Sequence, residues 1–177
     1  MNKKVLVFAG STSKNSINKQ LASYAATKLV KTSYDVVDLN DYVAPLFSID
    51  EEEDKGFPEN VQKFNDLLNQ YDGFIVSLAE HNGSYAAAFK NIFDWVSRID
   101  RKVFRGKLLL LMATSPGGRG GALVLEAATS TFPHLGGNIV ATFSLPNFYD
   151  NFKDGRVSNK ELNNTLNEAV TIFERSI

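Results

Sequence analysis

Five short apolar runs divide the chain, and each of them is bounded by turn residues. They occupy positions 5–9, 36–39, 74–78, 108–113 and 139–143. Most are apolar at consecutive positions rather than at alternate ones, which is typical of strands that helices cover on both faces. The pattern therefore predicts five buried strands of a parallel sheet.

Between these runs, apolar residues recur at the three- and four-residue spacing of amphipathic helices. The first three stripes span 17–29, 61–71 and 85–96. We expect a fourth helix from Arg119 or Gly120 to Thr131, where the chain approaches a proline. Before the last stripe, Ser158 and Glu161 have the spacing of a capping box, so the pattern predicts a fifth helix from there.

Five strands that alternate with five helices indicate an open, doubly wound α/β sheet with helices on both faces. Two strand orders compete, and the flavodoxin-like order 2-1-3-4-5 suits five strands better than the Rossmann order. A ligand then binds where the order reverses, beyond the ends of the first and third strands. The loops that can form its site are 10–16, 79–84 and 114–121.

The length of 177 residues predicts one domain over 1–177, because roughly 150 residues make a typical domain. The longest connection, 40–57, contains the acidic run 50–54. We interpret this run as a solvated loop, since clustered like charges favour water over a packed interior.

Composition and charge exclude several classes of function. With 19 lysines and arginines against 20 aspartates and glutamates, the net charge of -1 predicts no broad basic surface for nucleic acid or an anionic membrane. There is no cysteine and there are two histidines, so we expect neither a metal site nor a catalytic thiol. No apolar run approaches the roughly 20 residues of a membrane span. We expect a cytoplasmic protein, in which any redox chemistry would have to come from a bound cofactor.

The first loop is rich in small polar residues, and it leads from a strand into a helix. Hydroxyl groups and the free N–H groups of a helix start can bind an anion, which the helix dipole also favours. A monophosphate fits this loop better than a triphosphate, because the phosphate-gripping lysine motif of nucleotide triphosphatases is absent. The alternative is that Ser16 merely caps the helix. The candidate binding residues are Ser11, Ser13, Lys14, Ser16, Ile17 and Asn18.

The second loop places Glu80, His81, Asn82 and Gly83 at the end of a buried strand. Such a polar cluster exceeds the needs of a solvent-facing turn, and its glycine permits close approach of the backbone to a planar ligand. His81 by itself is weak evidence for a general base or a metal ligand, and packing or hydrogen bonding is its more common role. We therefore treat these four residues as candidates for binding a heterocycle.

The third loop is rich in glycine, as expected of a backbone that lies closely against a flat ligand. Its candidate residues are Ser115, Pro116, Gly117, Gly118 and Gly121. The loop departs from the dinucleotide-binding fingerprint, because Leu123 stands where the last glycine should be. A nucleophile elbow is also absent, since Ser84 follows Gly83 directly.

These three loops resemble those of the NADPH-dependent FMN reductases, flavodoxin-like enzymes that include quinone, azo-dye and chromate reductases. The family's phosphate motif, Gly-Ser-x-Arg-x-x-Ser-x-Asn, is matched over 10–18. Its flavin motif, Pro-Glu-Tyr-Asn-Gly-Ser, is matched over 79–84, and its glycine loop over 115–121. The chain departs at three positions: Ser13 replaces the arginine, His81 the tyrosine and Ala79 the proline.

The resemblance implies an oxidoreductase that binds FMN, takes electrons from NADPH or NADH and passes them to a quinone-like or other small acceptor. The flavin carries the reactive atom, so no side chain needs to be catalytic and none is assigned. The resemblance also implies a homodimer or homotetramer. Two alternatives remain: an electron carrier, which is usually far more acidic than this chain, and a non-catalytic relative with weakened flavin binding.

Overall fold

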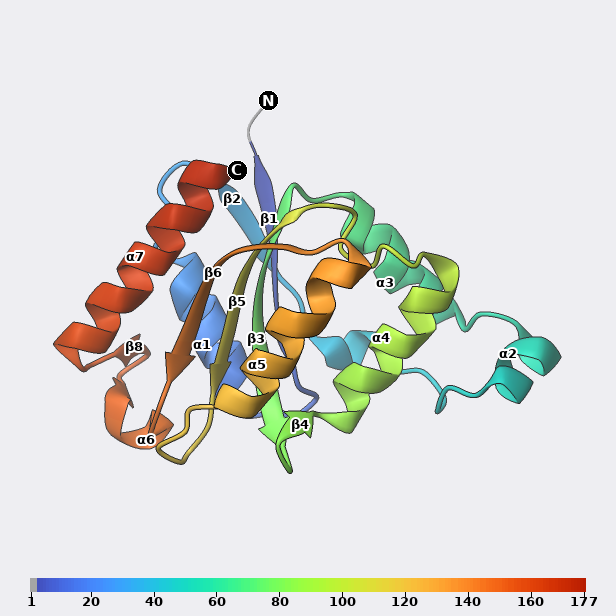
Figure 1. Ribbon diagram of the computed structural model, residues 1–177, viewed down its shortest axis with the longest axis horizontal. Helices are drawn as coiled ribbons and strands as arrows, with labels where there is room; N and C mark the ends of the chain where they lie inside the picture. The colour runs from blue at the N-terminus through green and yellow to red at the C-terminus, as the bar shows by residue number, and fades with distance from the viewer. Residues whose placement is uncertain (1–2) are drawn as a thin grey trace.

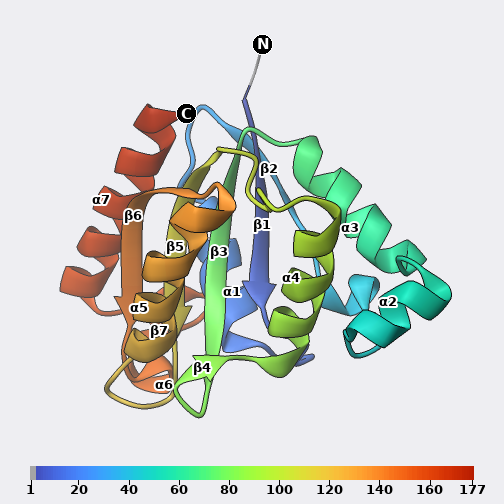
Figure 2. The same ribbon diagram turned by 45° about the vertical axis from the view of Figure 1, so that its right-hand side comes forward.

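Five parallel strands form the centre of the computed structural model, which describes residues 3–177. Their order is β2-β1-β3-β5-β6, and Figure 2 shows them side by side. Counted along the chain, this is the predicted flavodoxin-like order 2-1-3-4-5, which is thus confirmed. The strands are β1 (Lys4–Gly10), β2 (Ser33–Val36), β3 (Gly73–His81), β5 (Leu108–Thr114) and β6 (Asn138–Leu145).

Helices cover both faces of this sheet, as Figure 1 shows. Along β1, Val5 and Val7 pack toward one face, whereas Leu6 and Phe8 pack toward the other. A strand covered on both sides needs apolar residues at consecutive positions, which explains the pattern in the sequence. One face carries α1 (Ile17–Ala26) and α7 (Lys160–Ser176), and the other carries α3 (Glu59–Asn69), α4 (Ala87–Ile99) and α5 (Ala122–Thr131).

The second strand is displaced from its predicted position. The apolar run 36–39 was expected to form it, but β2 ends at Val36 and pairs with the start of β1. β2 lies at the edge of the sheet, where most of its side chains are exposed, so it carries little apolar signal. Leu39 is buried because it begins the short helix η1 (Leu39–Tyr42), which packs on the core.

The acidic run 50–54 is helical, so its interpretation as a loop is wrong. It belongs to α2 (Ile49–Lys55), whose N-terminal cap is the Ser48 hydroxyl, which accepts a hydrogen bond from the Glu51 amide. Acidic side chains in a first turn are stabilised by the helix dipole. Arg98 on α4 pairs with Glu52 at 2.8 Å, which anchors this helix to the body of the protein.

Two helices begin later than predicted. α5 begins at Ala122 rather than at Arg119 or Gly120, because Gly120 and Gly121 adopt left-handed φ angles of 58° and 79°. α7 is capped by Asn159 and not by Ser158. The Asn159 Oδ1 accepts hydrogen bonds from the amides of Glu161 and Leu162, at 3.1 Å each. An asparagine cap serves as well as serine, so the helix itself was predicted correctly.

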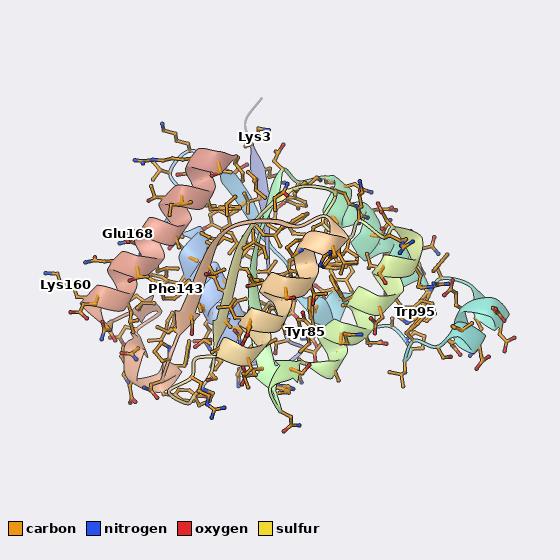
Figure 3. All side chains as sticks on the ribbon, in the orientation of Figure 1. Lys3, Tyr85, Trp95, Phe143, Lys160 and Glu168 are labelled. Carbon is orange, nitrogen blue, oxygen red and sulfur yellow. The ribbon has the colours of Figure 1, made fainter. Side chains whose placement is uncertain are left out.

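The remaining short elements are β4 (Ser84–Tyr85), η2 (Phe132–Leu135), α6 (Phe148–Asn151), β7 (Phe152–Lys153) and β8 (Arg156–Val157). In Figure 2, β4 and α6 lie at the lower edge, where the arrowheads of the strands point. Figure 3 labels Trp95 on α4 beside the segment that carries α2, and its indole N–H donates to the Pro45 carbonyl at 2.8 Å. Within residues 3–177, no helix combines the length and apolar character that crossing a bilayer requires.

Candidate functional site

The three loops expected to form a site meet at one cavity of about 270 Å³. It lies at the carboxyl ends of β1, β3 and β5, where the strand order reverses. Nine of the predicted residues line it: Ser11, Ser13, Ser16, Ile17, Asn18, Glu80, His81, Ser115 and Pro116. The structure thus brings the three loops together as the topology predicts.

Six predicted residues do not line this cavity: Lys14, Asn82, Gly83, Gly117, Gly118 and Gly121. Of the lining residues that were not singled out, Asn15, Ala79 and Thr114 belong to the expected loops. Tyr149 belongs to none of them. It lies on α6, shortly after β6. Because the carboxyl ends of parallel strands share one edge of the sheet, its position after the last strand could have indicated that it belongs to the site.

Ser16 does cap the first helix. Its hydroxyl accepts a hydrogen bond from the Lys19 amide at 3.1 Å, and its own amide donates to the Ser13 carbonyl at 3.1 Å. The Ser11 hydroxyl accepts from the Ser13 amide at 3.2 Å, which closes the turn. A hydroxyl that accepts a bond still has a proton to donate. Capping by Ser16 and anion binding by the same hydroxyl are therefore compatible.

Asn18 joins the first loop to the strands β3 and β5. Its Oδ1 accepts hydrogen bonds from the Thr114 amide at 3.0 Å and the Ser77 hydroxyl at 2.7 Å, and its Nδ2 donates to the Thr114 carbonyl at 3.2 Å. The residue is only 2% exposed. Most of the hydrogen-bonding capacity of this side chain is therefore used inside the protein.

Two lysines lie near the first loop, and they differ in whether they are already paired with an acidic side chain. Lys14 is exposed at the tip of the loop. The Lys19 ammonium donates a hydrogen bond to the carboxylate of Asp38 after β2, and this contact holds the pKa of Asp38 below its usual value. Lys19 is thus already paired, whereas Lys14 extends toward solvent.

The second loop is a β-hairpin rather than an open loop. β3 continues to His81, which pairs with Ser84 of β4. The two residues between them, Asn82 and Gly83, have φ angles of 52° and 76°, as a two-residue hairpin turn requires. Gly83 therefore meets the φ requirement of this turn. His81 is exposed and lines the cavity.

The Glu80 carboxylate connects this hairpin to α5. Its Oε2 accepts hydrogen bonds from the amides of Leu123 and Val124 at 2.9 and 3.1 Å. These are two of the free N–H groups at the start of α5, and a carboxylate there also interacts favourably with the helix dipole. Glu80 therefore fixes the second loop to α5, the helix that follows the third loop.

The glycines of the third loop have two different roles. A Cβ on Gly120 would lie 2.4 Å from the Ser144 hydroxyl oxygen, and one on Gly121 would lie 2.8 Å from the Ala113 Cβ. Both glycines are needed for packing against β5 and β6. At Gly117, by contrast, no atom lies within 4 Å of an added Cβ, so this part of the loop is open.

The third loop is also held to the segment that carries Tyr149. The amide of Asn147 donates to the Gly117 carbonyl at 3.0 Å, and the amide of Phe148 donates to the Ser115 carbonyl at 3.1 Å. Backbone hydrogen bonds of this kind fix the loop without using side chains that could bind a ligand. Tyr149 itself is 61% exposed at the rim of the cavity.

The site combines the serines of the first loop, which lead directly into the N-terminus of α1, with the third loop, which is open at Gly117. Within residues 3–177, no three histidine, aspartate or glutamate side chains are grouped so that they could share a metal ion. The serine hydroxyls beside the N-terminus of α1 are donors that could bind an anion.

Residues 3–150 match the family model described as NADPH-dependent FMN reductase. The chain is 31% identical over 157 residues to a 2-hydroxy-1,4-benzoquinone reductase of a Burkholderia species, covering 87% of this chain and 81% of that one. A quinone reductase of Escherichia coli K12 is 32% identical over 119 residues, which are 67% of this chain. The chain spans only 63% of the length of that enzyme.

Among solved structures, the flavoenzyme NAD(P)H:(acceptor) oxidoreductase FerB of Paracoccus denitrificans is similar over 98% of both chains. Its TM-score is 0.73 and its sequence identity is 25%. An NAD(P)H:quinone oxidoreductase of Methanothermobacter marburgensis shares the fold, with a TM-score of 0.67, 15% identity and coverage of 99% of this chain and 98% of that one. The chain belongs to the NADPH-dependent FMN reductase family.

Proposed function

We propose that this chain binds FMN and transfers electrons from NADPH or NADH to a quinone-like or other small acceptor. The observation that carries the proposal is the meeting of three polar loops at one cavity, at the point where the strand order reverses. Open α/β sheets bind their ligands at such points. Relatives named as quinone reductases support the choice of acceptor.

The first loop has the donors that a phosphate monoester needs. The hydroxyls of Ser11, Ser13 and Ser16 line the cavity, and α1 begins directly after them. Hydroxyl and backbone donors at a helix N-terminus favour an anion through hydrogen bonds and through the helix dipole. In our proposal the loop holds the FMN phosphate, and Lys14 adds a positive charge from the solvent side.

The second and third loops would hold the flavin ring. His81 and Pro116 line the cavity from opposite loops, and Gly117 leaves its surroundings open. Asn82, Gly83 and Gly121 contribute indirectly, because they shape the hairpin and the start of α5. Glu80 lines the cavity and also holds the hairpin to α5. Tyr149 joins the binding residues as an exposed ring at the rim.

FMN, when bound, supplies the redox chemistry by accepting a hydride from a nicotinamide and donating electrons to an acceptor. The protein then needs only to bind, to orient and to exclude water. We therefore propose no catalytic side chain.

A charge substitution in the first loop tests the binding mode. Ser16→Glu should abolish FMN binding, because it places a carboxylate against the phosphate while glutamate can still occupy the start of a helix. Ser48→Glu is a matched control, since Ser48 caps α2 in the same way and does not line the cavity. FMN titration followed by fluorescence, with far-UV circular dichroism to verify folding, gives the answer. Unchanged affinity in a folded Ser16→Glu protein would refute the assignment.

A second measurement separates an enzyme from an electron carrier. The FMN-loaded protein should oxidise NADPH or NADH and reduce a soluble benzoquinone in the steady state. A protein that binds FMN but oxidises neither nicotinamide would be a carrier or a non-catalytic relative.

We further propose that the residues 1–177 act as one FMN-binding domain, which assembles into a homodimer or homotetramer in the cytoplasm. Support for assembly comes from Val43, Leu46 and Ile49, which are 60%, 83% and 61% exposed in the segment from the end of η1 to the start of α2. Sedimentation velocity of the protein and of Leu46→Asp tests assembly, and cell fractionation tests the location.

A further inference from the structure

We propose that Asn18 is a positioning residue, which sets the affinity for flavin by holding the first loop against the third rather than by binding the phosphate. This inference rests on the proposed function, since it concerns how the same cavity is shaped. It assigns to Asn18 a role different from that of the serines beside it.

The geometry at Asn18 has the features of a clamp. Its side-chain amide forms hydrogen bonds with both the N–H and the C=O of Thr114, at 3.0 and 3.2 Å. It also accepts a hydrogen bond from the Ser77 hydroxyl at 2.7 Å. Thr114 and Ser77 are 1% and 0% exposed. Because hydrogen bonds to buried groups have no competing water, removing one partner leaves the other unsatisfied.

The clamp joins the elements from which all three loops arise. Asn18 is the second residue of α1, Ser77 is in β3, and Thr114 is the last residue of β5. Figure 2 shows α1 behind β3. The Thr114 hydroxyl donates to the Leu145 carbonyl at 2.7 Å, which extends the connection to the end of β6 and so toward α6.

Thr114 connects this clamp to the cavity. Ser115 and Pro116 follow it directly and line the cavity, while Ser16 precedes Asn18 by two residues and lines the opposite side. Without the amide, the Thr114 N–H and C=O would lack their partner, and the loops would be free to move apart. A binding site that must first be ordered binds more weakly than one that is preorganised.

The substitution Asn18→Asp tests this mechanism through pH. A protonated carboxyl group has the shape of the amide, and its O–H can donate to the Thr114 carbonyl as Nδ2 does. The ionised carboxylate instead opposes the Thr114 carbonyl, and burial raises the pKa of such a group. Flavin binding by this variant should therefore be weak near pH 8 and should recover near pH 5, relative to the unmodified protein at the same pH.

Riboflavin, which lacks the phosphate, separates positioning from direct contact. If Asn18 positions the loops, Asn18→Asp near pH 8 should lower the affinity for riboflavin about tenfold or more, as expected for a lost buried hydrogen bond. It should lower the affinity for FMN at least as much, because the ionised carboxylate also repels the phosphate. The control is Asn15→Asp, which makes the same charge change at an exposed residue that lines the same cavity. This control should lower the affinity for FMN but leave the affinity for riboflavin almost unchanged.

Hydrogen exchange of the ligand-free proteins provides a readout that does not depend on flavin. Near pH 8, amides of 115–121 should exchange faster in Asn18→Asp than in the unmodified protein, while those of Asn15→Asp should not. Loss of FMN affinity with riboflavin affinity retained would show direct phosphate contact, and unchanged affinity and exchange would reduce Asn18 to a role in packing. Either result overturns the inference. Failure of the unmodified protein to bind FMN would instead contradict the proposed function.

Discussion

The Glu80 Oε2 lies 2.9 Å from the Leu123 amide nitrogen, so the second loop supplies the N-terminal cap of the helix that follows the third. Gly121 directly precedes α5 and has no side chain with which to cap it. A helix whose own N-terminal residue lacks a capping group can be capped from elsewhere in the fold. Here the cap also aligns two loops of the candidate site.

Glu80→Ala should lower the free energy of unfolding by about 1 kcal/mol, because two amides of α5 lose their acceptor and the helix dipole loses a favourable charge. Glu80→Gln keeps an acceptor oxygen and should cost less. Urea unfolding followed by circular dichroism measures both variants. Equal stability of Glu80→Ala and the unmodified protein would show that water replaces the carboxylate without penalty.

Gly120→Ala should lower the free energy of unfolding by about 2 to 4 kcal/mol, because a left-handed φ and a clash with Ser144 add together. Its added Cβ would lie 2.4 Å from the Ser144 hydroxyl oxygen. Gly117→Ala is the matched control in the same loop, since no atom lies within 4 Å of its added Cβ. Thermal unfolding of the two variants should differ clearly. Similar melting temperatures would mean that the loop relaxes around the new methyl group.

Ser13→Arg should tighten FMN binding by about tenfold at low salt, because a guanidinium forms charge-assisted bonds to phosphate that a hydroxyl cannot match. Ser13 is exposed and lines the cavity, so the longer side chain has room. The gain should shrink as salt is added. Riboflavin affinity serves as the control and should not change. If FMN affinity does not improve at low salt, another cation already neutralises the phosphate.

His81→Tyr should keep the rate of flavin reduction by NAD(P)H within about tenfold of the original, because hydride transfer to flavin needs no acid from the protein. His81 is exposed and lines the cavity. Anaerobic stopped-flow measurement with saturating FMN gives this rate. A decrease of about a thousandfold with FMN still bound would identify His81 as a proton donor, since losing a positioned acid costs that order of magnitude.

The Asp38 carboxylate should make stability depend on pH below about 4, near the usual pKa of aspartate. The hydrogen bond from Lys19 lowers the pKa of Asp38 in the folded protein. A lowered pKa contributes stability that is present above the unfolded value and is lost as pH falls through the folded value. The unfolding free energies of the protein and of Asp38→Asn should therefore converge as pH falls from about 5 to 3. A constant difference would show that the ion pair contributes nothing.

Local pattern by itself determined the architecture of this protein. Consecutive apolar residues such as Val5 to Phe8 are typical of a strand that helices cover on both faces, and their alternation with helical patterns predicted a doubly wound sheet. The strand order and the meeting of three loops were then consequences of topology. Capping by Ser16, one of the two interpretations that the first loop allowed, is a local feature because it depends on residues three positions apart.

Only the tertiary structure decided features that depend on residues distant in the chain. The edge position of β2 explains why its sequence lacks an apolar pattern, and Arg98 from the distant helix α4 ties α2 to the body of the protein. Asn18 lies 96 residues from Thr114, and Glu80 lies 43 residues from Leu123, so no local pattern could show that these side chains hold loops together. Hydrogen bonds to a buried partner are formed only when the chain has folded, and they are what distinguishes a residue that shapes the cavity from one that faces it.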